Sequence, residues 1–398
     1  METTYSLFSV FGIEAEYMIV DKTTLKVAPL AESVLSSLNH GVVQNEVDLG
    51  EASVSNELVS HVIEIKCSTP EPDLNEIDSK FHKTILKINS FLSSHNAILM
   101  PTAIHPWMNP DQETVLWPYG QKEIYNQYNK IFDCRGHGWS NLQSIHINLP
   151  YANEEEFLKL YSAIRAVLPL IPYLAASSPF YEGKLGELAD NRLAFYEKNQ
   201  IRVPSITGDV IPEPLTSLVD YHRLLEKIYR AISPYDPEKI LQHPWLNSRG
   251  AIVKFDVQAI EIRVMDIQES PLMDSSLIFF ITELIKKVAT TEEFLDNAQS
   301  LDQKTLRGIY DQGKAFSEFK LPLDYSAAFR SLSKETEINL FISDLYQSVR
   351  SEIPKKYQVG IETIIQSGNL SKRMVRASLS PELYQSLIHT LEANTIYG

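Results

Sequence analysis

The stretch Phe11-Gly12-Ile13-Glu14-Ala15-Glu16-Tyr17-Met18-Ile19-Val20-Asp21 decides the fold, because its residues alternate in type. Alternation with a period of two predicts a β-strand with one buried apolar face. The opposite face carries Glu14 and Glu16, which lie about 7 Å apart along a strand. Two such carboxylates repel each other unless a cation lies between them. An edge strand with a solvated acidic face has the same pattern, so the rest of the chain must decide.

The composition is that of a large folded protein. The chain has 398 residues, 44% of them hydrophobic, enough for one large domain or two closely packed ones. Its net charge of -15 argues against nucleic-acid binding and against an anionic membrane surface, but not against small phosphate ligands. The start shows no leader pattern, and the longest apolar run, 277–285, is too short to span a membrane. We therefore expect a cytoplasmic protein.

Strands and helices are mixed up to about residue 270, and the remainder reads as helical. Strands are expected at 11–21, within 42–58, and at 61–68, 97–104, 142–149 and 249–267, the last as one long strand or a bent pair. Helices are expected at 31–39, 74–96, 154–174 with a bend at Pro169 and Pro172, and 218–232. From Pro271 onward we expect helices at 275–289, 292–298, 302–316, 335–351, 354–366 and 381–393.

Several of these strands carry polar residues two positions apart on one face and apolar residues on the other. The pairs are Glu14/Glu16, Glu64/Lys66, His146/Asn148 and Glu261/Arg263, and Ser144 precedes the third pair on its face. One such pair is typical of a wet strand face, but four of them predict a concave sheet surface lined with charged groups. Carboxylate oxygens with one imidazole suit the hard ions Mg²⁺ or Mn²⁺. His61 falls on the apolar face of its strand, so we expect a hydrogen-bonded core histidine there.

Many carboxylates on one sheet suit phosphoryl transfer, in which divalent ions bridge the polyphosphate and an arginine stabilises the transferred group. The chain has no P-loop motif, no Rossmann glycine pattern and no serine nucleophile elbow. The residues by themselves therefore indicate either a metal-dependent phosphotransferase or an ATP-driven ligase.

The order of the motifs carries a family resemblance. The chain resembles the glutamate–cysteine ligase family 2, carboxylate–amine ligases related to glutamine synthetase. The resemblance rests on Gly12-Ile13-Glu14-Ala15-Glu16-Tyr17, Asn56-Glu57-Leu58, Ile63-Glu64-Ile65-Lys66, Ser144-Ile145-His146-Ile147-Asn148, Ser177-Ser178-Pro179-Phe180 and Ile260-Glu261-Ile262-Arg263-Val264-Met265-Asp266.

This resemblance implies an α+β fold with a curved antiparallel sheet of the glutamine synthetase catalytic type, backed by helices. We expect residues 1–290 to form the catalytic domain and residues 291–398 a helical C-terminal region packed on it. It also implies ATP and Mg²⁺ (or Mn²⁺), a small carboxylate such as an amino acid, and an amine as substrates. Amide formation would pass through an acyl phosphate and release ADP and phosphate. Neither nucleic acid nor membrane is expected as a partner, and a homo-oligomer is open.

The resemblance also implies roles for individual residues. Glu14, Glu57 and Glu64 resemble the ligands of one metal site, and Glu16, His146 and Glu261 those of the sites that face the phosphates. Arg263 resembles the arginine that contacts the transferred phosphoryl group. Cofactor or substrate anions are expected at Arg192, Lys66, Ser144 and Asn148, and Glu57 or Glu51 is the candidate base for the amine.

Two departures from the family pattern concern the substrates. Ser177 replaces an asparagine that is common in the family, and Asn148 replaces a second histidine. Two alternatives stay open beside the ligase, namely a metal-dependent small-molecule kinase and a nucleotide-binding regulatory protein without turnover. A kinase would leave a stable phosphorylated product and need no amine.

Overall fold

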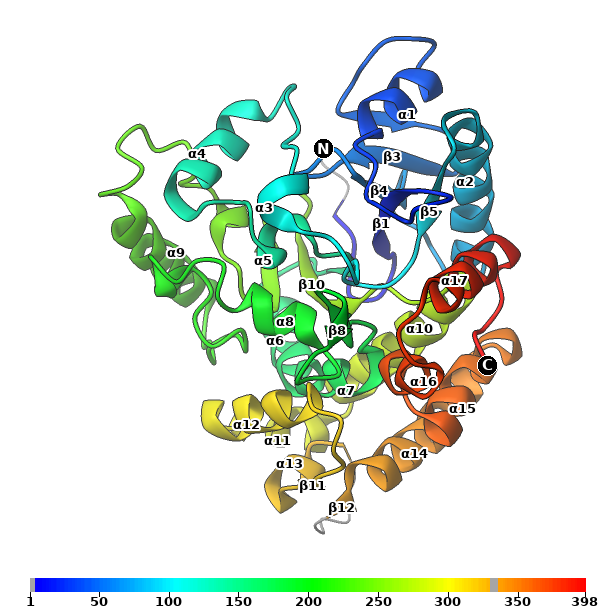
Figure 1. Cartoon of the computed structure of the whole chain (residues 1–398). Helices are drawn as coiled ribbons and strands as arrows, with labels where there is room; N and C mark the ends of the chain where they lie inside the picture. The colour runs from blue at the N-terminus through cyan, green and yellow to red at the C-terminus, as the bar shows by residue number, and fades with distance from the viewer. Residues whose placement is uncertain (1–3, 330–335) are drawn as a thin grey trace.

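A computed structural model describes residues 4–329 and 336–398. An eight-stranded antiparallel sheet runs through the molecule in the order β2-β3-β4-β1-β6-β10-β9, with β5 also paired to β1 (Figure 1). Its strands are β1 (Gly12–Asp21), β2 (Glu46–Asp48), β3 (Ala52–Asn56), β4 (Val62–Cys67), β5 (Ala97–Met100), β6 (Ser144–Pro150), β9 (Ala251–Lys254) and β10 (Ala259–Asp266). The expected α+β architecture, an antiparallel sheet backed by helices, is confirmed.

Strand β1 lies at the centre of this sheet, as its alternating pattern requires. It pairs with β4 along one edge and with β6 and β5 along the other. Its residues Ile13, Ala15, Tyr17 and Ile19 are all buried, with exposed fractions of 1% or less. The side chains of Ile63 and Ile65 on β4, and of Ile145 and Ile147 on β6, continue the same apolar layer.

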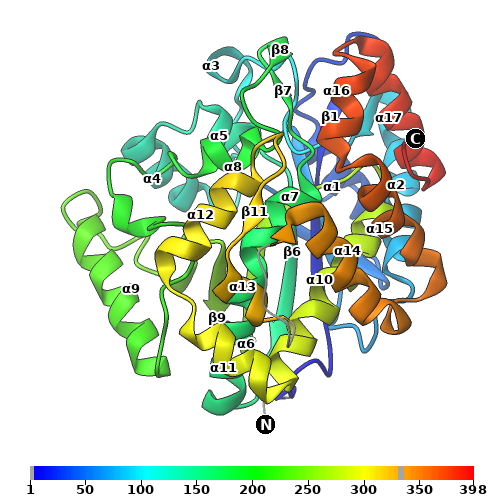
Figure 2. The same ribbon diagram turned by 90° about the horizontal axis from the view of Figure 1, so that it is seen from below.

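A layer of helices covers the apolar face of the sheet. The main ones are α2 (Ile77–Leu92), α6 (Glu154–Val167), α7 (Ile171–Ala175) and α10 (Pro271–Thr290). Figure 2 shows α6, α7 and α10 next to the strands, with α11 to α14 outside them. The segment Glu154–Ala175 is long and apolar enough to span a membrane by composition, but 83% of its most apolar window is buried inside the protein. That burial is typical of the core helix of a globular protein.

The expected bend in that segment is confirmed. Helix α6 ends at Val167, a 3₁₀ turn spans Leu168–Leu170, and α7 begins at Ile171. Proline lacks the backbone N–H that an interior helical position donates, so Pro169 and Pro172 each fall at the start of a new helical piece.

Residues 291–398 are mainly helical and extend the same core. They form α11 (Glu292–Ser300), α12 (Gln303–Gly313), α13 (Leu323–Ala327), α14 (Ile338–Val349), α15 (Lys355–Ser367), α16 (Leu370–Ala377) and α17 (Pro381–Ala393). Tyr325, Phe341 and Tyr357 from this region belong to the hydrophobic cluster that also contains Ile13 and Ala15 of β1. The domain boundary at residue 290 stays a prediction.

The expectation of helix alone after Pro271 is wrong at one place. The short strands β11 (Lys320–Leu321) and β12 (Thr336–Glu337) pair there. The expected start of a helix at Glu335 lies outside the described residues, and α14 begins at Ile338. Helix α16, which begins at Leu370, was not expected from the sequence. Basic residues are interspersed along this helix, and its buried apolar residues are Leu370 and Met374. Two apolar positions are too few to give a clear helical period.

The region 249–267 forms a bent pair rather than one long strand. Strands β9 and β10 make an antiparallel hairpin, with residues 255–258 as the turn. Along β10 the pairing with β6 shifts by one residue, because Ile262 lies opposite Ile147 whereas Met265 lies opposite Ile145. Arg263 and Val264 therefore share one partner position, that of His146. Such a β-bulge redirects the side chains that follow it, so the clean alternation expected for 260–266 breaks at this point.

Two buried histidines should make the stability of this protein sensitive to acid. As expected, His61 is a core histidine, 1% exposed, and its Nε2 lies 2.9 Å from the Ser140 carbonyl oxygen. His105 donates from Nε2 to the Leu25 carbonyl and accepts the Trp107 and Met108 N–H groups at Nδ1, an arrangement that needs the neutral ring. Burial lowers the pKa of His61 to about 3 and that of His105 to about 4.

We predict that the free energy of unfolding falls as the pH drops below about 6.5. The unfolded chain binds a proton at each histidine from that pH downward, and the folded chain does not until pH 4 or lower. Each histidine then costs at most about 1.4 kcal/mol per pH unit. Urea unfolding between pH 4 and 7 measures the slope. His61→Gln should flatten it, and His40→Gln, at an exposed position, should not; equal slopes in all three proteins would contradict the prediction.

Candidate active site

A cavity of about 770 Å³ lies over the polar face of the sheet. Its floor comes from β1, β3, β4, β6, β9 and β10, and its rim from the loops around α4 (Lys122–Phe132), α5 (His137–Ser140) and α8 (Asn191–Tyr196). This volume lies within the range of small-molecule sites. The cavity is lined by most of the residues predicted for the site, namely Glu14, Glu16, Glu57, Glu64, Lys66, Ser144, His146, Arg192, Glu261 and Arg263.

The strand register brings these residues together. Glu14 pairs with His146 across β1 and β6, and with Lys66 across β1 and β4. Glu16 pairs with Glu64 across the same two strands. Directly opposed residues of an antiparallel pair have their side chains on one face, about 5 Å apart at Cβ. Three segments that are distant in the chain, β1, β4 and β6, thus meet because in each strand the alternate residues that face the cavity are the polar ones.

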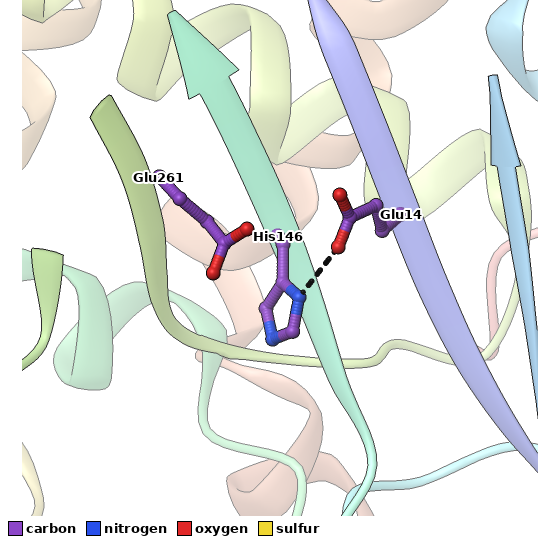
Figure 3. A group of neighbouring side chains, drawn as sticks. All are labelled: Glu14, His146 and Glu261. Atoms are coloured by element: carbon purple, nitrogen blue, oxygen red, sulfur yellow. Dashed lines mark hydrogen bonds and ion pairs between the residues drawn. The ribbon is translucent and has the colours of Figure 1, made fainter. Parts of the chain in front are cut away.

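One group of possible metal donors consists of Glu14, His146 and Glu261. One donor atom from each lies within 4.8 Å of the others. Figure 3 shows His146 between the two carboxylates, with all three side chains reaching into the same space from β1, β6 and β10. The Nδ1 atom of His146 lies 3.0 Å from Glu14 Oε2. Two carboxylates and an imidazole form a donor set that Mg²⁺ or Mn²⁺ accepts.

The second group consists of Glu16, Glu64 and, again, His146. Glu16 accepts hydrogen bonds from the backbone N–H of Ser144 at 2.7 Å and from its hydroxyl at 3.0 Å. Glu64 accepts one from the Ser55 hydroxyl at 2.8 Å. These bonds fix the two carboxylates and leave their other oxygen atoms for a ligand.

The split of ligands between ions stays a prediction, but the donor groups of the structure differ from the ones that the resemblance implied. Glu14 lies with His146 and Glu261, whereas Glu16 lies with Glu64 and His146. The strand register is the physical reason, because Glu14 lies opposite His146 and Glu16 lies opposite Glu64. Ser144, expected to bind cofactor, here holds Glu16.

Glu57 follows directly on β3, in the turn that leads to β4, so the turn needed to bring it near Glu64 is present. Burial and the negative charges of Glu16 and Glu64 raise its pKa well above the usual range. The structure therefore places it beside the second group, although it is not within that compact set of donor atoms. Glu51, the other candidate base, is exposed, pairs with Lys83 at 3.3 Å and does not line the cavity.

Three cationic side chains balance these carboxylates. Lys254 Nζ lies 3.2 Å from Glu14 Oε1 and 2.9 Å from Glu261 Oε2. Arg263 pairs with the other oxygen of Glu261, and Lys66 lies 3.6 Å from Glu64 and 2.7 Å from Glu46. Sequence reasoning missed Lys254. The β9–β10 hairpin could have revealed it, because Glu261 lies opposite Ile252 and Lys254 follows two residues later on the same face.

Arg192 and Asn148 lie at opposite margins of the carboxylate cluster. Arg192 is 2% exposed, lines the cavity and forms an ion pair with the buried Asp266. Asn148 donates to Glu14 Oε1 at 3.1 Å and lines an adjoining smaller cavity of about 380 Å³, not the large one. Gly12 lies opposite Asn148 on β1. A side chain at Gly12 would bring its Cβ atom within 3.1 Å of the Asn148 Cβ, so the glycine leaves room for Asn148.

The pKa values of the cluster follow from these contacts. Burial raises the pKa of Glu14, but the hydrogen bond from His146 and the charge of Lys254 outweigh it and hold that pKa well below the usual range. Burial lowers the pKa of His146, yet the bond to Glu14 and the charges of Glu261 and Glu16 raise it to about 9. Burial and the charge of Glu14 raise the pKa of Glu64 to about 7. The cluster thus holds protons at neutral pH that a metal ion would displace.

We expect Mn²⁺ to bind this cluster more tightly as the pH rises from 6 to 9. The ion competes with the protons on Glu64 and His146, whose pKa values are about 7 and about 9, so affinity should rise by about tenfold per pH unit for each proton displaced. Titration calorimetry in buffers of different ionisation enthalpy measures both affinity and proton release. His146→Gln should abolish the rise in Mn²⁺ affinity between pH 7 and 9, whereas the matched control His82→Gln should not. A pH-independent affinity would contradict the prediction.

Comparison with known proteins gives matches along most of the chain. The sequence pattern of the glutamate–cysteine ligase family 2 matches residues 10–385. A protein of Archaeoglobus fulgidus named "Uncharacterized protein" is 35% identical over 275 residues, 69% of this chain and 73% of that protein. A protein of Rubrobacter xylanophilus named "Putative glutamate--cysteine ligase 2-3" is 24% identical over 292 residues, 71% and 70% of the two chains.

Among solved structures, the crystal structure of the complex between the prokaryotic ubiquitin-like protein Pup and its ligase PafA is similar with a TM-score of 0.42 and 10% identity, covering 94% of this chain and 71% of that one. The assignment to a family rests on the sequence pattern, which spans nearly the whole chain. This protein therefore belongs to the glutamate–cysteine ligase family 2, a family of carboxylate–amine ligases.

Proposed function

We propose that this protein is an ATP-dependent, ADP-forming ligase that joins a small carboxylate to an amine through an acyl phosphate. The observation that carries the proposal is the convergence of Glu14, Glu16, Glu64, Glu261 and His146 in one cavity, with Arg263 and Lys254 beside them. Paired groups of hard donors next to fixed cations suit the polyphosphate of ATP. Family membership supports the formation of an amide bond.

The donor set fits Mg²⁺ or Mn²⁺. Glu14, His146 and Glu261 would hold one ion, and Glu16 and Glu64 another. When bound, such ions neutralise the phosphate oxygens and orient them for in-line transfer. The second donor group, with Glu57 beside it, contains more carboxylates than Lys66 neutralises, and like charges held this close indicate a site prepared for added positive charge.

In the first step, an oxygen of the substrate carboxylate attacks the γ-phosphorus of ATP. The new O–P bond forms while the bond from the γ-phosphorus to the β,γ-bridging oxygen breaks, and ADP leaves with that electron pair. Arg263 is oriented by Glu261, and Lys254 lies between Glu14 and Glu261, so both are in place to stabilise charge on the transferred group.

In the second step, the amine attacks the carbonyl carbon of the acyl phosphate, and inorganic phosphate leaves with the electron pair of the C–O bond. The attacking nitrogen must lose one proton. Glu57 is the candidate acceptor, since it lines the cavity and is outside the two compact donor groups. Binding of both substrates in this one cavity would supply the positioning that intermolecular amide formation lacks in water.

We further propose L-glutamate and L-cysteine as the first substrate pair to examine, because the family takes its name from that reaction. Ser177 and Asn148 depart from the family pattern, so a wider panel of amino acids and amines belongs in the same screen. A cytoplasmic location is part of this proposal.

We predict that the purified protein releases ADP and phosphate only when ATP, a divalent ion, a carboxylate and an amine are all present. Coupled ADP detection with mass spectrometry of the product checks this. Glu16→Gln and Arg263→Ala should each lower kcat by about a hundredfold or more, because each removes a charge that the reacting phosphoryl group requires.

The matched control is Glu155→Gln, at an exposed carboxylate that pairs only with Lys159 on α6, and it should keep wild-type rates. Activity that survives both Glu16→Gln and Arg263→Ala would rule out the proposal. A stable phosphorylated product without need of an amine would instead identify a kinase. Nucleotide binding without ADP formation under any combination would identify a regulatory nucleotide-binding protein.

A further inference from the structure

We infer that Asp266 is a positioning residue that fixes Arg192 as a receptor for the anionic end of the carboxylate substrate. The inference rests on the proposed ligase function, since it concerns a substrate of that same cavity. Asp266 is the last residue of β10 and does not itself line the cavity, so it acts through Arg192.

The Asp266 carboxylate is fully buried and accepts three donors. Its Oδ1 accepts the Nε–H of Arg192, and its Oδ2 accepts the backbone N–H of Ser177 and the hydroxyl of Ser178, both at 2.9 Å. A buried carboxylate is costly unless it is paired and hydrogen-bonded, and here both oxygen atoms are occupied. The side chain is therefore held in one orientation.

Asp266 holds Arg192 at two points. The direct ion pair fixes the guanidinium. The second link runs through Ser178, whose hydroxyl donates to Asp266 while its oxygen accepts the backbone N–H of Arg192 at 3.1 Å. The backbone and the guanidinium of Arg192 are thus both held by the Asp266 carboxylate. Rotation of the guanidinium would break the ion pair. This explains what the motif Ser177-Ser178-Pro179-Phe180 does in this chain.

The bulge in β10 makes this contact possible. Asp266 lies three residues after Arg263, and a regular strand would put the two on opposite faces. Because Arg263 and Val264 share one partner position, the parity changes, and Asp266 lies opposite Ser144 on the polar side. The two arginines then meet, because Arg192 Nη1 and Nη2 lie 3.4 and 3.5 Å from the Arg263 carbonyl oxygen.

The terminal nitrogens of Arg192 keep donor capacity for a ligand. Each Nη carries two hydrogens, and their contacts with the described residues are the two long ones to the Arg263 carbonyl. Arg192 lines the cavity, and its planar guanidinium is held in one orientation by Asp266. This suits bidentate binding of a carboxylate.

The C-terminal helices hold the segment that precedes Arg192. The carbonyl oxygen of Lys314, after α12, accepts the backbone N–H groups of Ala189 and Asp190 at 2.8 and 3.1 Å. Ser371 of α16 donates its hydroxyl to the Ala189 carbonyl at 2.6 Å. Asp190 then caps α8 by accepting the Leu193 N–H at 2.9 Å. The position of Arg192 is set from both the sheet and the helical region.

Asp266→Asn tests the inference with little change of shape. An asparagine offers one acceptor oxygen, so it cannot serve both Arg192 and the Ser177 and Ser178 donors. With L-glutamate as the probe, we expect its KM to rise about tenfold or more, while kcat and the KM for ATP change by less than about threefold. A raised KM with little change in kcat indicates weaker substrate binding rather than a slower chemical step.

A double-mutant cycle separates this role from a structural one. Arg192→Lys should raise the KM for L-glutamate to a similar extent, and adding Asp266→Asn to it should cost little more, because the carboxylate would have lost the group it positions. Additive effects would overturn the inference. Asp236→Asn is the matched control, since Asp236 is equally buried, accepts the Ile240 and Leu241 N–H groups and does not line the cavity. It should leave the KM unchanged.

Two further measurements keep the test decisive. Should Asp266→Asn fail to fold, Ser178→Ala removes the hydroxyl that links Asp266 to the Arg192 backbone and leaves the direct Asp266–Arg192 ion pair, so it should raise the KM in the same direction by a smaller factor. Calorimetric binding of L-glutamate needs no turnover. A wild-type protein that binds L-glutamate but forms no ADP contradicts the proposed ligase, and an Asp266→Asn variant with equal affinity overturns the role of Asp266. Absence of L-glutamate binding to the wild-type protein also overturns it.

Discussion

The pairing of β1 with β4 on one side and β6 on the other is the constraint on which the rest of this structure depends. Glu14 lies opposite His146 and Lys66, and Glu16 lies opposite Glu64. A slip of one residue would turn Glu14 and Glu16 into the core and expose Ile13 and Ala15. The register is therefore held by the apolar face, and the apolar face in turn determines which polar groups meet. Packing and chemistry are specified by the same alternation.

Burying so many carboxylates has an electrostatic cost that the surroundings only partly offset. Lys254 and Arg263 compensate Glu261, and His146 compensates Glu14. Glu57 and Glu64 remain with raised pKa values, because burial disfavours their charged forms and neighbouring carboxylates repel them, Glu16 and Glu64 at Glu57 and Glu14 at Glu64. This excess of negative charge in the cavity of about 770 Å³ favours the binding of cations. The site is thus less stable than an apolar core would be, but its excess negative charge makes it suitable for binding cations.

The helical region contributes more than cover for the sheet. Residues after 290 share the main hydrophobic cluster with β1, and Lys314 and Ser371 contact the segment that carries Arg192. A local irregularity matters as much: the bulge at Arg263 and Val264 lets β10 present Glu261, Arg263 and Asp266 toward one side. Neither feature follows from the hydrophobic pattern, because a bulge costs only one ladder position and leaves the composition of the strand unchanged.

Much of the site could be predicted from local alternation combined with the ordered family motifs. The parity of Glu14, Glu64, His146 and Glu261 within their strands was enough to place them on one polar face. The division of ligands between Glu14 and Glu16 could not be predicted in this way, since both share a face and only the partner strands distinguish them. Lys254 was missed because a single lysine near a turn has no periodic signal, and Glu51 proved to lie outside the cavity.

By itself, the sequence determined that this chain builds a half-buried sheet with a carboxylate-rich face, covered by helices on the other side. That follows from side-chain alternation, which is a local property of the strand. Only the tertiary structure decided which carboxylate meets which partner, that Arg192 is held by Asp266, and that β10 bulges beside His146. The physical reason is that register and pairing join residues far apart in the chain, 74 positions for Arg192 and Asp266 and 132 for Glu14 and His146, and such contacts depend on the packing of the whole core.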